Sequence, residues 1–486
     1  MFRRVLAYCT YSAAIVLGST GFDPLQHSGP ASPYFDAPVQ PGLPVETPSG
    51  CKIDQAAFIV RHGSRYPEPG SFQGWLNLFS KFQNATYTAR GPLAFIPSWT
   101  PPVDDISHEP LFLSSTGASE AFALGVELRK RYGFTRGGDN FTLWSASQQR
   151  VVDTAAYYAR GYLSQGSYIA SPDLNRGFIV SLPDSVKDTS ANSLTPSASC
   201  PAYASGDHGS TMAALFRATY QNQIASRLNR DFLDGLELNA ADVGVMQDLC
   251  GFSDEINGDQ RFCNVFKPPE WLDYEYAHDL NYYYGSGPGN PLSATVGFPW
   301  VKAVTELFLA GPGNTTENGS FIPPPLIMGF THDNNLPPIL SALGLWNATV
   351  LPPSARDPNR MFRSSFVVAF RGYVAMERLS CSKVKPDTEV RHVANQSNSE
   401  ANEPTKKFVR IRVNNAPVPI PGCSSGPGAS CPLDGLVKHI QQRSLIAGRF
   451  VQQCGLENVA DAVSDATFLT QIPIDSEVIE LSPGIV

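Results

Sequence analysis

Three short apolar runs along the chain end abruptly in polar and charged residues. They are residues 56–60, followed by Arg61-His62-Gly63-Ser64-Arg65-Tyr66-Pro67; residues 141–144, followed by Ser145-Ala146-Ser147-Gln148-Gln149-Arg150; and residues 325–330, followed by Thr331-His332-Asp333-Asn334. Short apolar runs bounded in this way predict buried strands. Open α/β folds bind ligands at the carboxyl ends of their strands, so each polar cluster stands where a site is expected.

Helical patterns alternate with these strands. Residues 118–132 predict a helix with an N-cap within Ser114-Ser115-Thr116 and with Gly133 after its end. Its apolar face is expected to hold two pairs, Phe122 with Val126 and Leu124 with Leu128. Further helices are predicted over residues 74–82, 151–163, 211–232, 271–284, 337–343 and 433–447, and further strands over residues 366–370, 373–379 and 408–413.

The order of these elements predicts an α/β fold with an insertion. Residues 165–300 carry several helical patterns and no strong strand alternation, which favours a smaller, mostly helical inserted domain. The expected divisions are a signal peptide over 1–21, an extended arm over 22–50, a large α/β domain over 51–164 and 301–486, and the inserted domain between its two parts.

The amino terminus indicates secretion. Arg3 and Arg4 precede a mostly apolar stretch over residues 5–17, and the small residues 18–21 follow, which is the pattern of a signal peptide. The stretch is short for a membrane span, and no later segment approaches 20 apolar residues, so no stable membrane anchor is expected. A secreted protein, extracellular or held in a cell wall, is predicted.

Cysteines and glycosylation sequons agree with the secretory pathway. Cys9 lies in the expected signal peptide, and the eight that remain are Cys51, Cys200, Cys250, Cys263, Cys381, Cys423, Cys431 and Cys454. An even number favours disulfides in an oxidising compartment, and without a CxxC pair no zinc or other metal site is expected. Six Asn-x-Ser/Thr sequons are candidates for glycosylation: Asn84, Asn140, Asn314, Asn318, Asn347 and Asn395.

The net charge narrows the class of partner. At −8 the chain is a poor candidate for binding nucleic acid. An acidic protein with a locally cationic pocket suits small anionic substrates.

The first polar cluster suits phosphoryl transfer. The imidazole of His62 can attack phosphorus and carry the phosphoryl group covalently. Arg61 and Arg65 can hold the phosphate oxygens, because guanidinium is always charged and binds phosphate through two parallel hydrogen bonds. A solvated basic loop after a strand is the alternative without function.

The other clusters supply what the first lacks. Cleavage of a phosphate ester needs an acid that protonates the leaving alkoxide, and Asp333 is the natural candidate. His332 can donate to a phosphate oxygen. Arg150 follows the predicted strand at residues 141–144, just as Arg61 follows the strand at residues 56–60. Taken alone, Arg150 or the His332-Asp333 pair is more often an ordinary surface feature.

Together these motifs resemble the histidine acid phosphatases, and within them the secreted fungal acid phosphatases and phytases. The resemblance implies a large α/β sandwich domain like that of phosphoglycerate mutase with a smaller helical domain. It implies His62 as nucleophile, Asp333 as proton donor, and Arg61, Arg65, Arg150 and His332 as phosphate ligands, with no cofactor. It also implies four disulfides: Cys51 with Cys381, Cys200 with Cys454, Cys250 with Cys263, and Cys423 with Cys431.

One departure from the family bears on substrate. Phytases of this type surround the phosphate site with additional lysines, whereas Asn281 and Tyr282 stand at one such place here and only Arg90 offers charge at another. These three residues are the candidate outer substrate contacts. Fewer cations weaken the binding of a polyphosphate while leaving the first phosphate's site intact. A broad phosphomonoesterase is therefore predicted, with phytase, acting on inositol phosphates, as the alternative.

Two other classes compete with this interpretation. A phosphoglycerate mutase would share the Arg-His-Gly start, but a secretory signal argues against a glycolytic role. A non-catalytic cell-wall glycoprotein would tolerate loss of His62 or Asp333, and both residues are present.

Overall fold

The computed structural model describes residues 21–103, 111–134, 141–163, 176–184, 190–317, 319, 321–346, 350–382 and 405–481. Apart from residue 21, the expected signal peptide lies outside these residues, as do the sequons Asn140, Asn318, Asn347 and Asn395. Asn84 and Asn314 are described, and both are exposed. None of the helices in the described ranges is long and apolar enough to cross a membrane.

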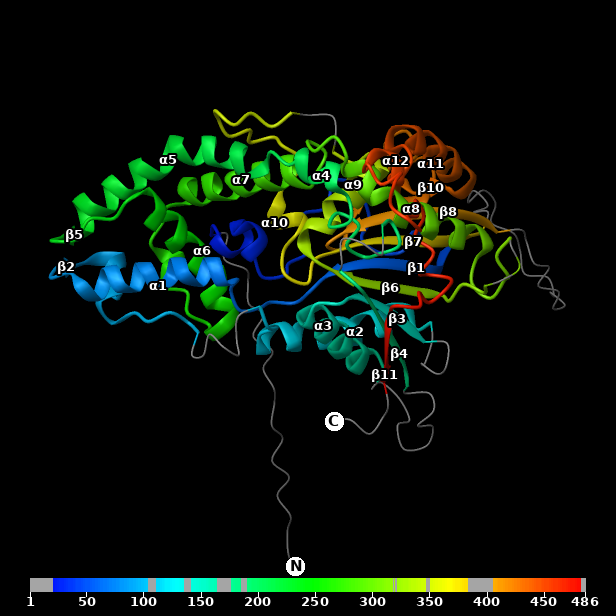
Figure 1. Ribbon diagram of the computed structural model, residues 1–486, viewed down its shortest axis with the longest axis horizontal. Helices are drawn as coiled ribbons and strands as arrows, with labels where there is room; N and C mark the ends of the chain where they lie inside the picture. The colour runs from blue at the N-terminus through cyan, green and yellow to red at the C-terminus, as the bar shows by residue number, and fades with distance from the viewer. Residues whose placement is uncertain are drawn as a thin grey trace, which may run out of the picture.

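A nine-stranded mixed sheet forms the centre of the larger part of the molecule (Figure 1). Its order is β10-β8-β7-β1-β6-β3-β4-β11, with β9 paired to β8. The four parallel strands are β1 (Cys51–Arg61), β6 (Leu326–Thr331), β3 (Thr142–Ala146) and β4 (Gly177–Leu182). Antiparallel pairing adds β7 (Tyr373–Cys381), β8 (Lys406–Val413), β9 (Ala416–Val418), β10 (Cys431–Pro432) and β11 (Glu477–Leu481).

The register of the parallel strands brings the polar clusters together. Arg61 of β1 is the direct partner of Thr331 of β6, and β3 pairs with the other side of β6. The residues that follow these strands therefore leave the sheet side by side at one edge, as the sequence predicts.

Helices cover both faces of the sheet (Figure 1). On one face lie α2 (Ser115–Tyr132) and α3 (Gln149–Leu163); on the other lie α8 (Ser293–Ala310), α9 (Leu336–Leu343), α11 (Leu433–Ala447) and the short α12 (Phe450–Gln453). Ser114 caps α2 by accepting from the amide of Gly117 at 3.1 Å, and Gly133 ends the helix with a φ of 60°. Of the three residues predicted to supply the cap, Ser114 is the one that does so, and the predicted end at Gly133 is confirmed.

A second group of helices extends to one side of the sheet (Figure 1). It contains α1 (Pro69–Asn84), α5 (Gly209–Phe232), α6 (Ala240–Asn257) and α7 (Pro268–Gly285), with the two-stranded pair β2 (Thr88–Ala89) and β5 (Leu233–Asp234) at its far end. The short α4 (Pro201–Ser205) and α10 (Ser364–Val367) lie between this group and the sheet. Residues 22–50 contain only two 3-10 turns, Pro24–His27 and Gly29–Ala31.

Two sequence-based expectations about single elements are wrong. Residues 366–370 are not a strand: α10 covers their start, and the chain turns at Arg371 (φ 58°) before β7 begins. The apolar run correctly indicates that Val367, Val368 and Phe370 are buried. A helical turn can bury such residues as well as a strand can, so the run does not determine the conformation. Phe122 does not join the apolar face of α2, because its side chain is 40% exposed while Leu124 and Leu128 are buried.

The expected inserted domain also begins too early. Strand β4 lies inside residues 165–300, and it was missed because a strand covered on both faces carries no alternation. The other expected boundary, residue 300, falls within α8, which packs against α9 of the large part. A division into a large α/β part and a smaller helical part, with the helical part starting after β4, stays a prediction.

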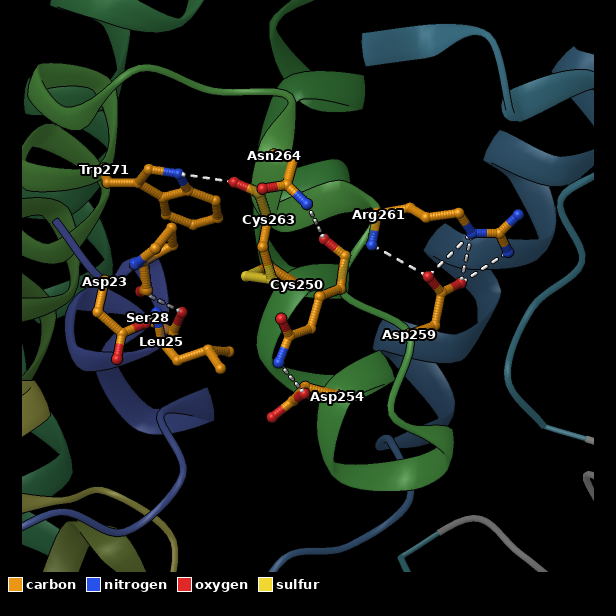
Figure 2. Close-up of a disulfide and its surroundings, with 12 residues drawn as sticks. Asp23, Leu25, Ser28, Cys250, Asp254, Asp259, Arg261, Cys263, Asn264 and Trp271 are labelled. Atoms are coloured by element: carbon orange, nitrogen blue, oxygen red, sulfur yellow. Dashed lines mark hydrogen bonds and ion pairs between the residues drawn. A yellow bond between two sulfur atoms is a disulfide. The ribbon is translucent and has the colours of Figure 1, made fainter. Parts of the chain in front are cut away.

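All four disulfides that the resemblance implies are present. Cys51 and Cys381 are direct partners in the β1–β7 register. Figure 2 shows the bond between Cys250 of α6 and Cys263 in the following turn, where the indole of Trp271 donates to the carbonyl oxygen of Cys263 at 3.3 Å. Leu25 and Ser28 of the amino-terminal arm lie beside this disulfide, since the first 3-10 turn packs on α6.

Candidate active site

His62 is buried immediately after β1, and its hydrogen bonds define its tautomer. Its backbone amide donates to the carbonyl oxygen of Thr331 at 3.0 Å, which ties it to β6. Its Nδ1 lies 2.9 Å from the carbonyl oxygen of Gly63. Because a carbonyl oxygen only accepts, Nδ1 carries the hydrogen and the lone pair of the neutral ring is on Nε2. Nε2 is therefore the ring atom that has a lone pair available to attack phosphorus.

The charges around His62 keep its ring neutral. Burial first, and then the positive charges of Arg61, Arg150 and Arg65, hold the pKa of His62 well below its ordinary value. A lowered pKa favours the neutral imidazole, whose lone pair is free, at a pH where an ordinary histidine is protonated. This environment suits a nucleophile that works at acid pH.

Arg61 is held in place from two sides. Nη1 donates to the carbonyl oxygens of Pro30, at 2.5 Å, and of Val368. The guanidinium carbon lies 4.4 Å from the centre of the Phe370 ring, and Nη2 pairs with Oδ2 of Asp333 at 3.1 Å. The amino-terminal arm, through Pro30, is thus part of the wall of this site.

Arg65 and Arg150 complete a cluster of cations. Arg65 donates to the carbonyl oxygen of Tyr66 at 2.9 Å and pairs with Glu68 at 3.0 Å. Burial and then the charge of Arg65 lower the pKa of Arg150 to about 10. Positive charges that lie close together in a buried site are stabilised by an anion bound among them. The cluster can therefore hold a multiply charged tetrahedral oxyanion.

His332 links this cluster to an acidic residue that the sequence analysis missed. Its Nδ1 lies 3.4 Å from Nη2 of Arg150, and its Nε2 lies 3.6 Å from Oδ2 of Asp184. An arginine only donates, so Nδ1 is the acceptor and Nε2 carries the hydrogen that faces Asp184. Burial opposes ionisation of Asp184, but its interactions with His332 and with the hydroxyl of Thr195 leave its pKa below the ordinary value.

Asp184 could have been found from the fourth parallel strand. It lies two residues beyond β4, at the same sheet edge as the other clusters. Without a predicted strand at residues 177–182, the sequence gives no reason to place Asp184 at the sheet edge. His332 is brought to the predicted place, with its ring centre 5.7 Å from that of His62.

Asp333 lies between Arg61 and Tyr282. Burial would raise the pKa of Asp333, but Arg61, Arg65 and His332, together with a hydrogen bond from the Tyr282 hydroxyl, lower it below its ordinary value. Burial and the charge of Asp333 raise the pKa of Tyr282, so its hydroxyl stays a donor. Tyr282 therefore reaches the site, through Asp333.

The structure does not bring Arg90 to this place. Arg90 follows β2 at the far end of the helical group and donates to the carbonyl oxygen of Asp231 at 3.0 Å (Figure 1). Asn281 lies on α7 next to Tyr282, where its backbone carbonyl packs closely on Gly209. Within the described ranges, no three His, Cys, Asp or Glu side chains are grouped so that they could hold a metal ion.

Comparison with known proteins identifies the fold and its relatives. The family described as "Histidine phosphatase superfamily (branch 2)" matches residues 52–414. The acid phosphatase PHO1 of Komagataella pastoris is 31% identical over 460 residues, covering 91% of this chain and 89% of that protein. The phytase PHO112 of Candida albicans is 29% identical over 446 residues, covering 89% and 87%.

A solved structure shares the fold. The crystal structure of the phytase from D. castellii superposes with a TM-score of 0.77 at 24% identity, covering 92% of this chain and 90% of that one. At this identity the similarity is one of fold.

Proposed function

The chain belongs to branch 2 of the histidine phosphatase superfamily and is a phosphomonoester hydrolase, and we propose that it works through a phosphoryl group carried on His62. In this proposal Arg61, Arg65 and Arg150 bind the phosphate oxygens of the substrate. Nε2 of His62 attacks phosphorus, the P–N bond forms, and the P–O bond to the leaving alcohol breaks. The observation that carries the proposal is the hydrogen bond from Nδ1 of His62 to the carbonyl oxygen of Gly63, because it leaves the lone pair of the ring on Nε2.

We assign the proton transfers to Asp333. Its proton goes to the leaving oxygen in the first step. In the second step Asp333 takes a proton from the attacking water, the P–N bond breaks and inorganic phosphate leaves. The same carboxyl group thus serves as acid and then as base.

The ion pair between Asp333 and Arg61 must be reconciled with the role of acid. Without substrate, the arginine charges favour the ionised carboxyl group. A bound phosphate takes up the charge of Arg61 and brings negative charge close to Asp333, and both effects raise the pKa of that group. Substrate binding therefore supplies the protonated acid at acid pH.

The substrate class that we propose is broad, namely simple phosphomonoesters. Tyr282 stands where the family resemblance would expect a lysine, and its hydroxyl donates to Asp333. Arg90 is engaged elsewhere. With neither adding charge around the first phosphate, a polyphosphate gains little over a monoester. The alternative, a phytase, draws on the relative in Candida albicans that carries this name.

Two measurements test these proposals. For the chemistry, His62→Ala should abolish hydrolysis of p-nitrophenyl phosphate at acid pH, and a variant that keeps more than a few per cent of the activity removes His62 from the role of nucleophile. For the substrate, kcat/KM over a panel of alkyl, aryl and inositol phosphates should vary little. A strong preference for phytate would favour the alternative.

We propose that the protein is secreted. Four disulfides, a leader-like amino terminus and the exposed sequons Asn84 and Asn314 support this location. Phosphatase activity in the culture medium or the cell wall of the source cells, lost when residues 1–21 are deleted, is the expected result.

A further inference from the structure

The turn after His62 is anchored by a hydroxyl group that lies between two carboxyl groups. The side chain of Ser64 hydrogen-bonds with Glu120 of α2, at 3.1 Å from its Oε2, and with Oε2 of Glu255 of α6. Glu255 is buried, with 4% of its surface exposed, and Ser64 is fully buried. Neither carboxyl group takes part in the reaction described above.

The chemistry of this contact requires a proton on one of the two acids. A serine hydroxyl has one hydrogen and can donate to only one partner. An ionised carboxyl group can only accept, so two ionised groups cannot both hydrogen-bond with the same hydroxyl. One of them must therefore donate its own hydrogen to the serine oxygen.

The surroundings decide which acid holds the proton. Burial raises the pKa of Glu120. The positive charge of Arg371 and the hydrogen bonds from the backbone amides of Ser64 and Tyr34 oppose this rise, because they favour the ionised form. The charged groups that act on Glu255 are negative, Glu120 and then the neighbouring Asp254. Burial and these charges raise the pKa of Glu255 to about 8. Glu255 is therefore the protonated member.

The anchored turn bears directly on His62. Residues 63 and 64 share one peptide group, and its carbonyl oxygen, that of Gly63, accepts the hydrogen from Nδ1 of His62. The next carbonyl oxygen, that of Ser64, accepts from the backbone amide and the hydroxyl of Ser114 at the start of α2. Orientation of the Gly63 carbonyl, and with it the tautomer of His62, thus depends on how Ser64 is held.

Close packing leaves this turn little room to adjust. A Cβ on Gly117 would lie 2.1 Å from the carbonyl oxygen of Ser64, so α2 touches the turn directly. Helix α6 is tied by the Cys250–Cys263 disulfide, a little over one turn before Glu255 (Figure 2). The side chain of Asp254 in the same figure accepts from Gln260 at 2.8 Å. A change in the Glu255–Ser64 contact must therefore be taken up by the turn itself.

We propose that Glu255 is a positioning residue for the phosphatase reaction: its carboxylic acid donates to Ser64, Ser64 donates to Glu120, and this chain fixes the carbonyl group that orients His62. When Glu255 loses its proton at higher pH, it can no longer donate to Ser64, and its negative charge repels that of Glu120. The hydrogen bonds that hold the turn are therefore weakened. The fold thus contains a requirement for acidic conditions separate from the protonation of Asp333. The proposal rests on the assignment of His62 as the nucleophile.

Two variants of Glu255 separate the proton from the packing. Glu255→Gln has an NH₂ group that donates at every pH, whereas Glu255→Met fills similar space with no donor. With p-nitrophenyl phosphate, whose leaving group does not need an acid, Glu255→Gln should keep kcat at pH 5 within about threefold of wild type. Glu255→Met should lose about tenfold or more, as expected when a reacting group is misplaced. From pH 7 to 9, kcat should fall less in Glu255→Gln than in wild type.

Thermal stability gives a readout that does not depend on the reaction. A group whose pKa is raised by folding stabilises the protein below its unfolded-state pKa, and this stability is lost as pH rises through the folded pKa. The Tm of wild type should therefore fall relative to that of Glu255→Gln between about pH 4.5 and pH 8, by about 3 °C or more. Glu306→Gln, an exchange at an exposed residue of α8, is the matched control and should track wild type.

The outcomes distinguish this inference from the proposed function. Equal kcat values and equal pH profiles for Glu255→Gln and Glu255→Met, or a constant Tm difference between wild type and Glu255→Gln, would overturn the role of Glu255. An active His62→Ala variant would instead overturn the nucleophile, and the Tm measurement would still report whether Glu255 holds a proton.

Discussion

Arg61 and Asp333 form an ion pair across the ends of two neighbouring parallel strands, with Nη2 and Oδ2 3.1 Å apart. The proposed phosphate ligand is thus paired with the proposed proton donor in the absence of substrate. Arg61 is paired with Thr331 at the ends of β1 and β6, and Asp333 lies two residues after Thr331. The pairing of these two strands therefore sets the distance between Arg61 and Asp333. A phosphate bound beside Arg61 would take up the charge of that arginine and so favour the protonated form of Asp333.

The role of Asp333 predicts a dependence on the leaving group. Asp333→Asn should lower kcat for alkyl phosphates by about 100-fold or more, because an alkoxide must be protonated as it leaves. The loss for p-nitrophenyl phosphate should be about tenfold smaller, since the phenolate leaves without a proton. Steady-state kinetics on both substrates give the comparison. Equal losses would remove Asp333 from the role of acid.

The hydrogen bond from Tyr282 predicts a shift in pH dependence. This bond lowers the pKa of Asp333, so Tyr282→Phe should raise it. A higher pKa keeps the acid protonated to higher pH, and the alkaline limb of kcat for an alkyl phosphate should move up by about 0.5–1 pH unit. A limb that stays in place, or moves to lower pH, would contradict the contact with Asp333.

The arginine cluster predicts that no metal ion is needed. Arg61, Arg65 and Arg150 bring the positive charge that a divalent ion would otherwise provide to the phosphate. Exhaustive dialysis against EDTA should leave kcat/KM for p-nitrophenyl phosphate unchanged. Activity that is lost on dialysis and restored by a single added cation would show this prediction to be wrong.

A buried ion network between the helical part and the loop before α10 predicts a large effect on stability. Arg360 pairs with Glu275 at 2.8 Å and with Asp279, and all three side chains are almost fully buried. Arg360→Met removes the almost fully buried cation of the network. Within the described part of the chain, Glu275 then keeps only the more exposed Arg363 and His27, and Asp279 keeps only the amide and hydroxyl of Ser364. The free energy of unfolding in urea should therefore fall by about 3–5 kcal/mol.

An exposed pair provides the control for this network. Arg230 lies 2.8 Å from Asp231, and its side chain is 70% exposed. Arg230→Met should cost less than about 1 kcal/mol. Similar losses for the two variants would mean that the buried network does not hold the helical part in place.

The sequence predicts which charged residues meet at the sheet edge, but it does not predict the residues that hold them there. His62, Arg61 and Asp333 follow apolar runs directly, so strand order alone places them at one edge. Strand β4 lacked alternation because both its faces are covered, and Asp184 was missed with it. The resemblance predicted the disulfides, which spacing could not determine.

Contacts between distant parts of the chain were beyond any local pattern. The carbonyl of Pro30, in an arm without periodicity, accepts from Arg61, and Glu255 reaches Ser64 from a helix 191 residues further along the chain. From sequence alone, a single glutamate in a helix is expected to be exposed to solvent. Only the packing of α6 on the turn after His62 brings Glu255 to Ser64. At residues 366–370 the sequence predicts burial correctly but the wrong secondary structure, because burial alone does not determine conformation.

The covalent intermediate tests the central claim most directly. Wild-type enzyme is mixed with substrate bearing a radiolabelled phosphate and quenched in alkali, which preserves phosphohistidine, and the labelled peptide is then identified by mass spectrometry. We predict one phosphate per active site on the peptide that contains His62, released by acid and absent from His62→Ala. Label that appears on another residue, or active wild-type enzyme that retains no label when the substrate has a fast leaving group, would contradict the account.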